Sequence, residues 1–407
     1  MASAFVRFGA PLACALVLLP CATVAAAEPQ ALSRDDSVAS VRLRAYDLAY
    51  NLDYDEAVAL MRTALERWPR EPTLYRSLGT MAWLKILFTR GSVTIDDYLG
   101  PMQKQYVAFK PPPAPLVAEF IGYVDRAAAL AQERLQRKPG DLDALYEYGA
   151  AVGLKASYTA TVEGRMLAAV RATLQAYKAH ERVLLAEPRR AEAGLLVGTY
   201  QYIIATLSWP LRWMARMAGF SASRERGLQL LERAARPPSD AQIESKFGLF
   251  IVYSRERRFD EAYAVVSDLA RRFPRNRMLW WNAASTALSA GRTEEAVRDV
   301  DEGFARFAAE RRPLVAGEAA LWHFKRGAIR AAAGRRDEAA ADLSAALATP
   351  GRDWIKGRAR IELARLALAR GDRRVAREEL GRARRLCAGD NDPLGVAAAD
   401  QLLAGLR

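Results

Sequence analysis

The sequence predicts an all-α protein built as an array of stacked helix hairpins. Three observations predict this fold. The segment YDEAVALMRTALERWP at residues 54–69 recurs as FDEAYAVVSDLARRFP at residues 259–274. The alanine Ala262 of the second copy recurs as Ala296, in the similar setting TEEAVRDV. No stretch alternates convincingly with the period of a strand. A recurrence with a period of about 34 residues is typical of arrays in which each unit packs on its neighbours.

Residues 1–27 have the composition of a secretory signal peptide. Arg7 supplies a positive charge, residues 10–19 are apolar, and the alanines at 25–27 form a small-residue cleavage site before Glu28. We therefore expect a cleaved signal and a periplasmic or secreted protein. The remaining residues, 28–407, are expected to form a single superhelical domain, since 51% of the chain is hydrophobic and can bury a large core.

Two other roles of residues 1–27 stay open. A membrane anchor would need about 20 apolar residues, and this apolar run is shorter. Lipoprotein processing at Cys21 is disfavoured because Pro20 stands where a small residue is expected.

The cysteines and the charge exclude some classes of protein. Cys14 and Cys21 lie in the expected signal, so the mature chain would keep Cys387 alone and could form no internal disulfide. The net charge is +13, but basic and acidic residues are mixed along the predicted helices, as in residues 255–261. This mixture indicates solvated helix faces, and we expect no nucleic-acid partner. Attraction to an anionic membrane surface or an acidic protein stays open.

The first predicted hairpin covers residues 38–71 and shows how each unit is built. Ala45 on its first helix and Ala57 on its second are small residues at the positions where the helices cross. Asp55 and Glu56 open the second helix, where negative charge favours the helix dipole. Pro69 follows that helix, since proline cannot continue it.

Later units repeat these signals in order. Small residues at the crossing position of a first helix are Gly79, Gly149, Gly198 and Ala284. Prolines that follow a second helix are Pro69, Pro139, Pro188 and Pro274, and Gly291 and Gly334 mark tight turns inside a unit. The segment 393–406 is predicted as a C-terminal helix that covers the last apolar face.

These positions resemble the tetratricopeptide-repeat (TPR) family, and the chain as a whole resembles secreted bacterial TPR proteins. The segment YRSLG at 75–79 matches the W-x2-L-G half of the motif, and Ala57, Met61, Ala64 and Pro69 match A-x3-F-x2-A-x4-P. The resemblance covers roughly residues 39–386; its copies are strong at 38–71, 243–276 and 277–310, fair at 320–353 and 357–390, and broken between 72 and 239. It implies a right-handed α-solenoid of about seven TPR-like hairpins with a C-terminal capping helix.

Three consecutive units carry extra residues between their helices, near 89–115, 156–170 and 205–222. Such insertions are where specific function concentrates. The first contains Asp96, Asp97 and Tyr98, around which an enzyme or accessory subunit could build a site, although no spacing demands it. The third places Trp209, Trp213, Met214, Met217 and Phe220 beside Arg212 and Arg216, a mixture that fits either a buried core or a membrane-surface assembly factor.

The sequence gives little support for chemistry. Its two histidines, His180 and His323, stand on separate predicted helices without partners at metal-ligand spacing. No phosphate-binding glycine loop or nucleophile motif is present. We therefore expect no enzyme activity, no metal and no cofactor.

An array of this kind presents a groove lined by its first helices. Tyrosine, tryptophan and arginine are the residues that most often dominate interface energies. By the family pattern, the groove positions are Arg42, Tyr46, Tyr50, Arg76, Trp83, Tyr146, Tyr202, Phe247, Arg255 and Trp281. The sequence thus predicts a protein–protein interaction scaffold of the bacterial cell envelope that binds a peptide or partner protein in this groove.

Overall fold

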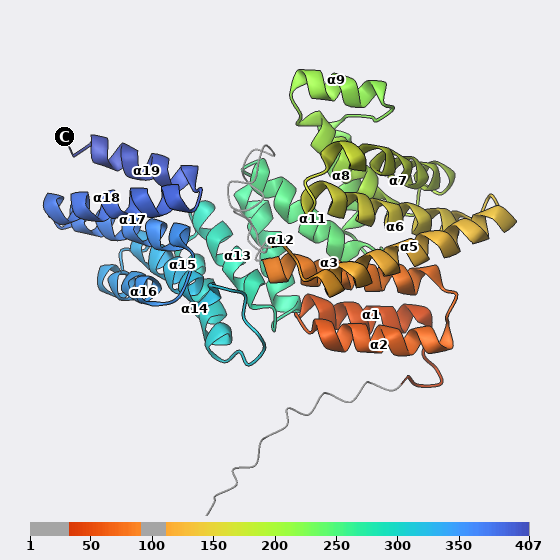
Figure 1. Cartoon of the computed structure of the whole chain (residues 1–407), viewed down its shortest axis with the longest axis horizontal. Helices are drawn as coiled ribbons and strands as arrows, with labels where there is room; N and C mark the ends of the chain where they lie inside the picture. The colour runs from red at the N-terminus through yellow and green to blue at the C-terminus, as the bar shows by residue number, and fades with distance from the viewer. Residues whose placement is uncertain (1–31, 91–110, 407) are drawn as a thin grey trace, which may run out of the picture.

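The computed structural model describes residues 32–90 and 111–406, and these residues form eighteen α-helices and no strand (Figure 1). The helices are α1 (Val38–Tyr50), α2 (Tyr54–Arg67), α3 (Pro72–Arg90), α5 (Ala114–Arg137), α6 (Leu142–Thr161), α7 (Met166–Ala186), α8 (Ala193–Ala205), α9 (Trp209–Met217), α10 (Arg224–Ala234), α11 (Gln242–Arg255), α12 (Phe259–Arg272), α13 (Arg277–Ser289), α14 (Thr293–Ala308), α15 (Glu318–Ala332), α16 (Arg336–Ala348), α17 (Asp353–Ala369), α18 (Arg373–Gly389) and α19 (Pro393–Ala404). The predicted all-α class is confirmed.

The helices pack as a chain of hairpins, each on the next. The described residues contain eight pairs, where the sequence suggested about seven: α1–α2, α3–α5, α6–α7, α8–α10, α11–α12, α13–α14, α15–α16 and α17–α18. Helix α9 lies between the members of the fourth pair, and α19 packs on α17 and α18 at the C-terminal end. The predicted C-terminal capping helix is therefore confirmed.

Small residues occupy the crossing points, as the sequence predicts. Ala45, Ala57, Ala262 and Ala296 are fully buried. A Cβ atom added to Gly79 of α3 would lie 2.7 Å from the Val124 Cγ1 atom of α5, which is closer than side chains approach one another. The anchor positions thus let two helix backbones come together, and this packing defines the TPR-like hairpin.

The predicted helix boundaries are also confirmed. Each of the four prolines named above stands two residues after a second helix, namely α2, α5, α7 and α12. Gly291 and Gly334 have φ angles of 75° and 76°, in the left-handed region that the tight turn inside a unit requires. Asp55 and Glu56 lie in the first turn of α2.

In the fourth pair two backbones approach closely, at Gly198 of α8 and Gly227 of α10. A Cβ on Gly227 would lie 2.7 Å from the Gly198 carbonyl oxygen and 2.8 Å from the Tyr202 backbone nitrogen. We expect Gly227→Ala to lower the free energy of unfolding by about 1–3 kcal/mol, because the backbones must separate. Urea denaturation measures this loss.

The matched control is Gly122 of α5, where an added Cβ meets nothing within 4 Å. Gly122→Ala should stabilise the protein slightly, by up to about 1 kcal/mol, because alanine favours a helix more than glycine does. Equal effects of the two substitutions would contradict the packing argument.

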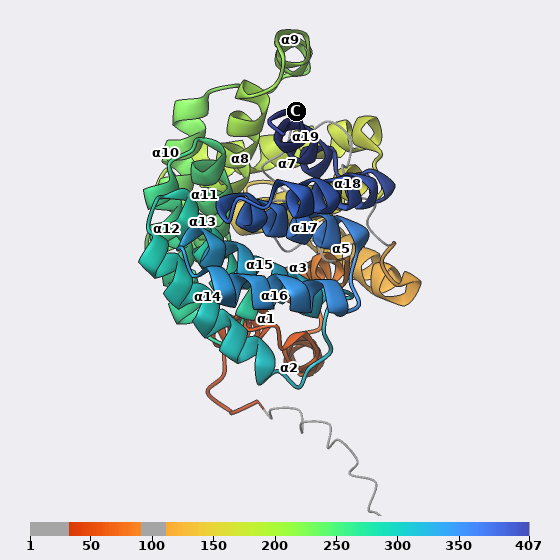
Figure 2. The same cartoon turned by 90° about the vertical axis from the view of Figure 1, so that its left-hand side faces the viewer.

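The three interrupted units accommodate their extra residues differently. Most of the first insertion, including Asp96, Asp97 and Tyr98, lies outside the described residues, as do residues 1–27 with the predicted signal. The second forms no long loop: α6 has 20 residues and α7 has 21, joined by residues 162–165. The third contains α9, which stands away from the other helices in both views (Figures 1 and 2).

The array closes on itself, which the repeat pattern does not reveal. The turn between α1 and α2 docks on loops that follow much later in the chain. Asp53 accepts hydrogen bonds from Arg275 at 2.5 Å and from Arg312 at 2.6 Å. The Asn51 side-chain oxygen accepts the Arg275 backbone N–H at 3.0 Å, and the Asn51 carbonyl accepts from Arg312 at 2.7 Å. The first hairpin and the α11–α15 region therefore share one hydrophobic core.

No helix within residues 32–90 and 111–406 combines the length and the apolar character that crossing a membrane requires. Helix α8 contains no charged residue, but it packs between its neighbours, with seven of its 13 residues buried and none exposed. This apolar segment is therefore a repeat helix packed inside the array.

Candidate protein-binding site

The ten predicted groove positions lie mostly inside the protein. Seven of them are buried, namely Arg42, Tyr46, Tyr50, Arg76, Tyr146, Tyr202 and Trp281. The other three, Trp83, Phe247 and Arg255, are partly buried. Most of these side chains therefore contact neighbouring helices of the same chain.

Arg76 of α3 connects the first helices of three successive pairs, α1, α3 and α6. Its guanidinium donates to both carboxylate oxygens of Glu147 on α6, at 2.6 and 3.3 Å, and to the Tyr46 hydroxyl on α1 at 3.4 Å. The guanidinium also lies 5.9 Å from the ring centroid of Tyr146. The guanidinium of Arg76 therefore directs three hydrogen bonds to neighbouring helices rather than to solvent.

The closure of the array covers the groove positions of the first helix. The Tyr50 ring lies 5.7 Å from the Phe247 ring of α11 and 5.2 Å from the Phe273 ring. Arg42 donates to Asp240 at 2.5 Å, just before α11. These contacts exist because α1 packs beside a helix that is far away in the sequence.

The remaining groove positions have internal neighbours as well. Trp83 packs between Phe120 and Tyr158, with ring centroids 5.9 and 6.1 Å away. Trp281 meets Trp322 edge-on at 5.4 Å. The Tyr202 hydroxyl donates to Glu256 at 2.6 Å, which follows Arg255 at the end of α11. Binding of a partner through these ten residues stays a prediction, and it would require contacts inside the array to open.

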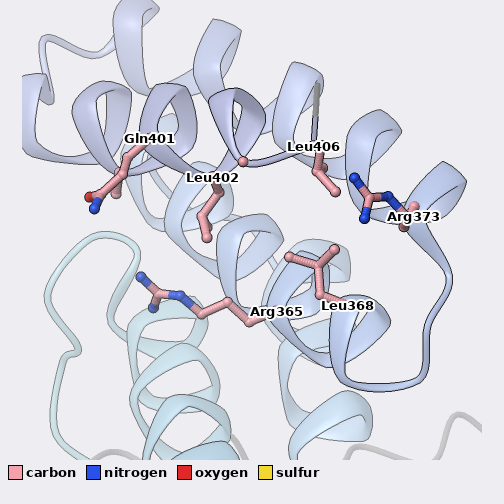
Figure 3. A pocket seen from close by; sticks show the side chains of 8 residues that line it. Arg365, Leu368, Arg373, Gln401, Leu402 and Leu406 are labelled. Carbon is pink, nitrogen blue, oxygen red and sulfur yellow. The ribbon is translucent and has the colours of Figure 1, made fainter.

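An open cavity lies at the C-terminal end of the array, between α17 and α19 (Figure 3). Its volume is about 460 Å³, and its lining residues are Arg365, Leu368, Arg373, Ala398, Gln401, Leu402, Gly405 and Leu406. Leu402 and Leu406 point from the α19 side toward Leu368 of α17, and the two arginines lie at opposite ends of this apolar floor (Figure 3). We call this cavity the terminal pocket.

The lining of the terminal pocket is apolar and positively charged. No carboxylate of the described residues lines it. Arg365 forms an ion pair with Glu362, one turn away on α17. Arg373 is exposed and has no carboxylate among the described residues within ion-pair distance. A neighbouring arginine, Arg377, donates to the Leu406 carbonyl at 2.8 Å and holds the end of the chain against α18. The terminal pocket can therefore bind an anionic group beside an apolar one.

Sequence reasoning overlooked the terminal pocket, although the repeat spacing contained a signal for it. In the last unit Ala376 is the buried anchor of the second helix, and Ala364, twelve residues earlier, is the buried small residue of the first. Arg365 and Leu368 stand one and four residues after Ala364, as Tyr46 and Ala49 do after Ala45. The groove pattern thus extends to α17. There the groove residues Arg365 and Leu368 line the terminal pocket instead of packing against a further repeat.

Two residues of types that catalysts often use, His180 and Cys387, are buried. Burial lowers the pKa of His180 to about 4, although its Nε2–H donates to the Tyr146 carbonyl at 3.2 Å. Burial, with the Asp392 carboxylate nearby, raises the pKa of the Cys387 thiol to about 12. The imidazole is therefore neutral and the thiol protonated at neutral pH. Neither residue lines the terminal pocket.

His180 and His323 lie on α7 and α15, on separate helices as the sequence predicts. In the part of the chain that the structure describes, no three histidine, cysteine or carboxylate side chains gather as metal ligands would. The expectation that the chain is not an enzyme stays a prediction.

Comparisons with known proteins give no specific relative. No protein-family model matches the chain, and no curated protein matches it in sequence.

Solved structures of helical-repeat proteins are similar at a low level. The crystal structure of yeast Tom70 has a TM-score of 0.38 and 11% identity over 90% of this chain and 88% of that one. A tetratricopeptide repeat protein from Parabacteroides merdae ATCC 43184 has a TM-score of 0.30 and 16% identity over 80% of this chain and 98% of that one. The crystal structure of the APC/C hetero-tetramer Cut9–Hcn1 has a TM-score of 0.35 and 11% identity over 89% of this chain and 83% of that one.

TM-scores and identities this low do not support a binding site shared with these proteins. The chain's own helix pairs and crossing residues establish its architecture. It is a TPR-like α-solenoid.

Proposed function

We propose that this protein is an interaction scaffold of the bacterial cell envelope, and that the terminal pocket binds a segment of a partner protein or peptide. The observation that carries the proposal is the exposed arginine pair over a leucine floor at the last groove position. The partner segment would present a carboxylate next to an apolar side chain.

Charge supports this assignment of the ligand. Guanidinium groups bind carboxylates through two parallel hydrogen bonds, and such charge-assisted bonds are stronger than neutral ones. Arg373 has no competing carboxylate among the described residues. The partner carboxylate could be a C-terminus or an acidic side chain.

The size and the floor of the terminal pocket support a peptide segment. A volume of about 460 Å³ lies within the range of ligand pockets. Leu368, Leu402 and Leu406 supply apolar surface from both sides of it. Burial of an apolar side chain there would add affinity and fix the register of the segment beside the arginines.

The envelope location rests on residues 1–27, whose charge, apolar run and alanine site are typical of an export signal. N-terminal sequencing of the protein from a periplasmic extract should begin at Glu28. Recovery of the intact chain from the cytoplasm would contradict the location.

A display library of peptides with free C-termini tests the pocket. Every described helix lies after residue 37, so the chain from Glu28 keeps all of them. We expect it to enrich peptides with an apolar residue beside a carboxylate. Arg373→Glu should weaken the selected peptides at least tenfold in fluorescence polarisation, because a charge-assisted contact becomes a repulsion.

The matched control is Arg374→Glu. Arg374 is the next residue, is exposed and pairs with Glu378 outside the terminal pocket, so its replacement should leave the affinity within about twofold. Equal weakening by both variants would indicate general attraction to a basic surface. The absence of any enriched motif would overturn the pocket assignment.

A further inference from the structure

Helix α9 exposes an unusual concentration of large apolar side chains. Eleven large hydrophobic residues are exposed among the side chains that the structure describes, and five of them lie in this nine-residue helix: Trp209, Leu211, Trp213, Met214 and Met217. Trp209 and Met217 are 70% and 71% exposed. No residue of α9 is buried, so burial of these side chains inside the fold does not explain their character.

The helix is held to the body by its opposite face. Ala215 packs against the cluster around Tyr177 and Phe220. Arg212 donates to the Ala205 carbonyl at 3.2 Å, and the Phe220 backbone N–H donates to the Ala215 carbonyl at 3.1 Å. Because 3.6 residues make one turn, Trp209, Trp213 and Met217 share one face, which points away from these attachments.

The surroundings of α9 are positively charged. Residues 193–223 contain Arg212 and Arg216 and no carboxylate. Residues 164–180, which include most of α7, contain Arg165, Arg171 and Lys178 and no carboxylate. The apolar helix is thus flanked only by basic residues within these two segments.

The loop that follows α9 contacts α7. A Cβ on Gly219, just after α9, would lie 3.7 Å from the Lys178 side chain and 4.0 Å from Leu174. Leu167 and Arg171 lie on the stripe of α7 that contains Leu174, spaced by three and four residues. Leu167 is 88% exposed. Exposed apolar and basic side chains of α7 therefore lie on the helix that the C-terminal end of α9 contacts.

We propose that α9 and this stripe of α7 rest in the interface of an anionic lipid bilayer. Trp209, Trp213 and Met217 would enter the boundary between headgroups and acyl chains. Arg212, Arg216 and Lys178 would contact the anionic headgroups. Tryptophan and arginine on a short amphipathic helix are the combination that interfacial helices use, and basic residues near an anionic surface add to the attraction.

The shape of the feature favours lipid over a folded partner. Helix α9 projects beyond the other helices in both views (Figures 1 and 2). A convex apolar helix fits a deformable lipid interface without a complementary groove. Nine residues extend for only about 14 Å, so the helix would lie in the plane of the membrane rather than cross it.

Vesicle flotation tests the proposal with the chain from Glu28, which lacks the apolar run of residues 10–19. We expect it to float with vesicles of two parts phosphatidylcholine to one part phosphatidylglycerol and to stay at the bottom with pure phosphatidylcholine. Trp209→Ser with Trp213→Ser should lower the partition coefficient at least tenfold. Arg212→Gln with Arg216→Gln should lower it about fivefold for each charge removed, as the attraction of one basic residue implies.

The matched control is Leu43→Ser with Leu394→Ser, which replaces two other exposed leucines, on α1 and α19. Its partition coefficient should equal that of the parent. Circular dichroism should be unchanged for every variant, because none of these side chains is buried. Arg373→Glu should leave flotation unchanged as well, so the lipid surface and the peptide pocket are tested separately.

Three results would overturn the inference. The first is no flotation with anionic vesicles. The second is equal flotation of the parent and the tryptophan variant. The third is a dimer in sedimentation velocity that the tryptophan variant abolishes while no lipid is bound, which would assign the face to a second copy of the chain.

Discussion

Replacement of Arg277 by methionine is expected to lower the free energy of unfolding by about 3–5 kcal/mol, because it leaves the buried Glu318 carboxylate without its cation. Arg277 and Glu318 are each 1% exposed. The guanidinium donates to the two oxygens of Glu318 at 2.5 and 2.9 Å and to Glu310 at 2.7 Å. Chemical denaturation of the chain from Glu28 measures the loss.

Two further variants test the cause. Arg311→Met changes an exposed arginine in the neighbouring loop and should shift stability by less than about 0.5 kcal/mol. The double variant Arg277→Met with Glu318→Leu should recover much of the loss, since a buried ion pair can often be replaced by apolar residues. If the double variant loses as much free energy of unfolding as the two single variants together, the loss of the ion pair is not the cause.

Glu310 connects this network to the closure of the array. Burial alone would raise the pKa of Glu310, but hydrogen bonds from the Arg312 side chain and backbone, and the charges of Arg312 and Arg277, outweigh it and hold the pKa at about 2. The stability that this carboxylate provides is therefore present above its unfolded pKa, near 4.3. It is lost as the pH falls from there toward 2.

Replacement of Arg76 by alanine is also expected to cost about 3–5 kcal/mol, although the sequence assigned Arg76 to a binding groove. Without Arg76, the Glu147 carboxylate of α6, which is 6% exposed, would be buried without its ion-pair partner. The expected result is a lower unfolding midpoint. Peptide affinity at the terminal pocket should not change at temperatures where the variant is folded.

The control is a surface pair of the same chemistry. Arg62 of α2 contacts Glu119 of α5 at 3.2 Å, and about half of each side chain is exposed. Arg62→Ala should cost less than about 1 kcal/mol, as exposed ion pairs do. An unchanged unfolding midpoint for Arg76→Ala would show that this arginine is available to a partner after all.

The repeat architecture could be predicted because its signals are local. Each signal depends only on neighbours within the same repeat or the next. The signals are a small residue at a crossing point, a proline after a second helix and a glycine in a turn. Ala57, Ala262 and Pro274 therefore gave the right helix pairs and the right boundaries.

The groove positions depend on how the array curves, which no local pattern records. Tyr50 meets Phe247 and Phe273 only because the first hairpin packs on the fifth and sixth. The same reasoning assigned Tyr46 to a groove, but it could not tell that other helices of the chain cover this position. Helix α9 was different: Trp209, Trp213, Met214 and Met217 were expected either in a core or at a membrane surface, and their exposure excludes the core, whereas Phe220, just after the helix, is buried.

The contact between residues 51–53 and residues 275–312 has a consequence for how the protein folds. The hydrogen bonds to Asp53 and Asn51 need Arg275 and Arg312, which are synthesised long after the first hairpin. A repeat array usually folds by stepwise addition of units. Here the turn at residues 51–53 is completed only when Arg275 and Arg312 have folded against it, so we expect the first hairpin to unfold together with the fifth and sixth pairs rather than to fray alone.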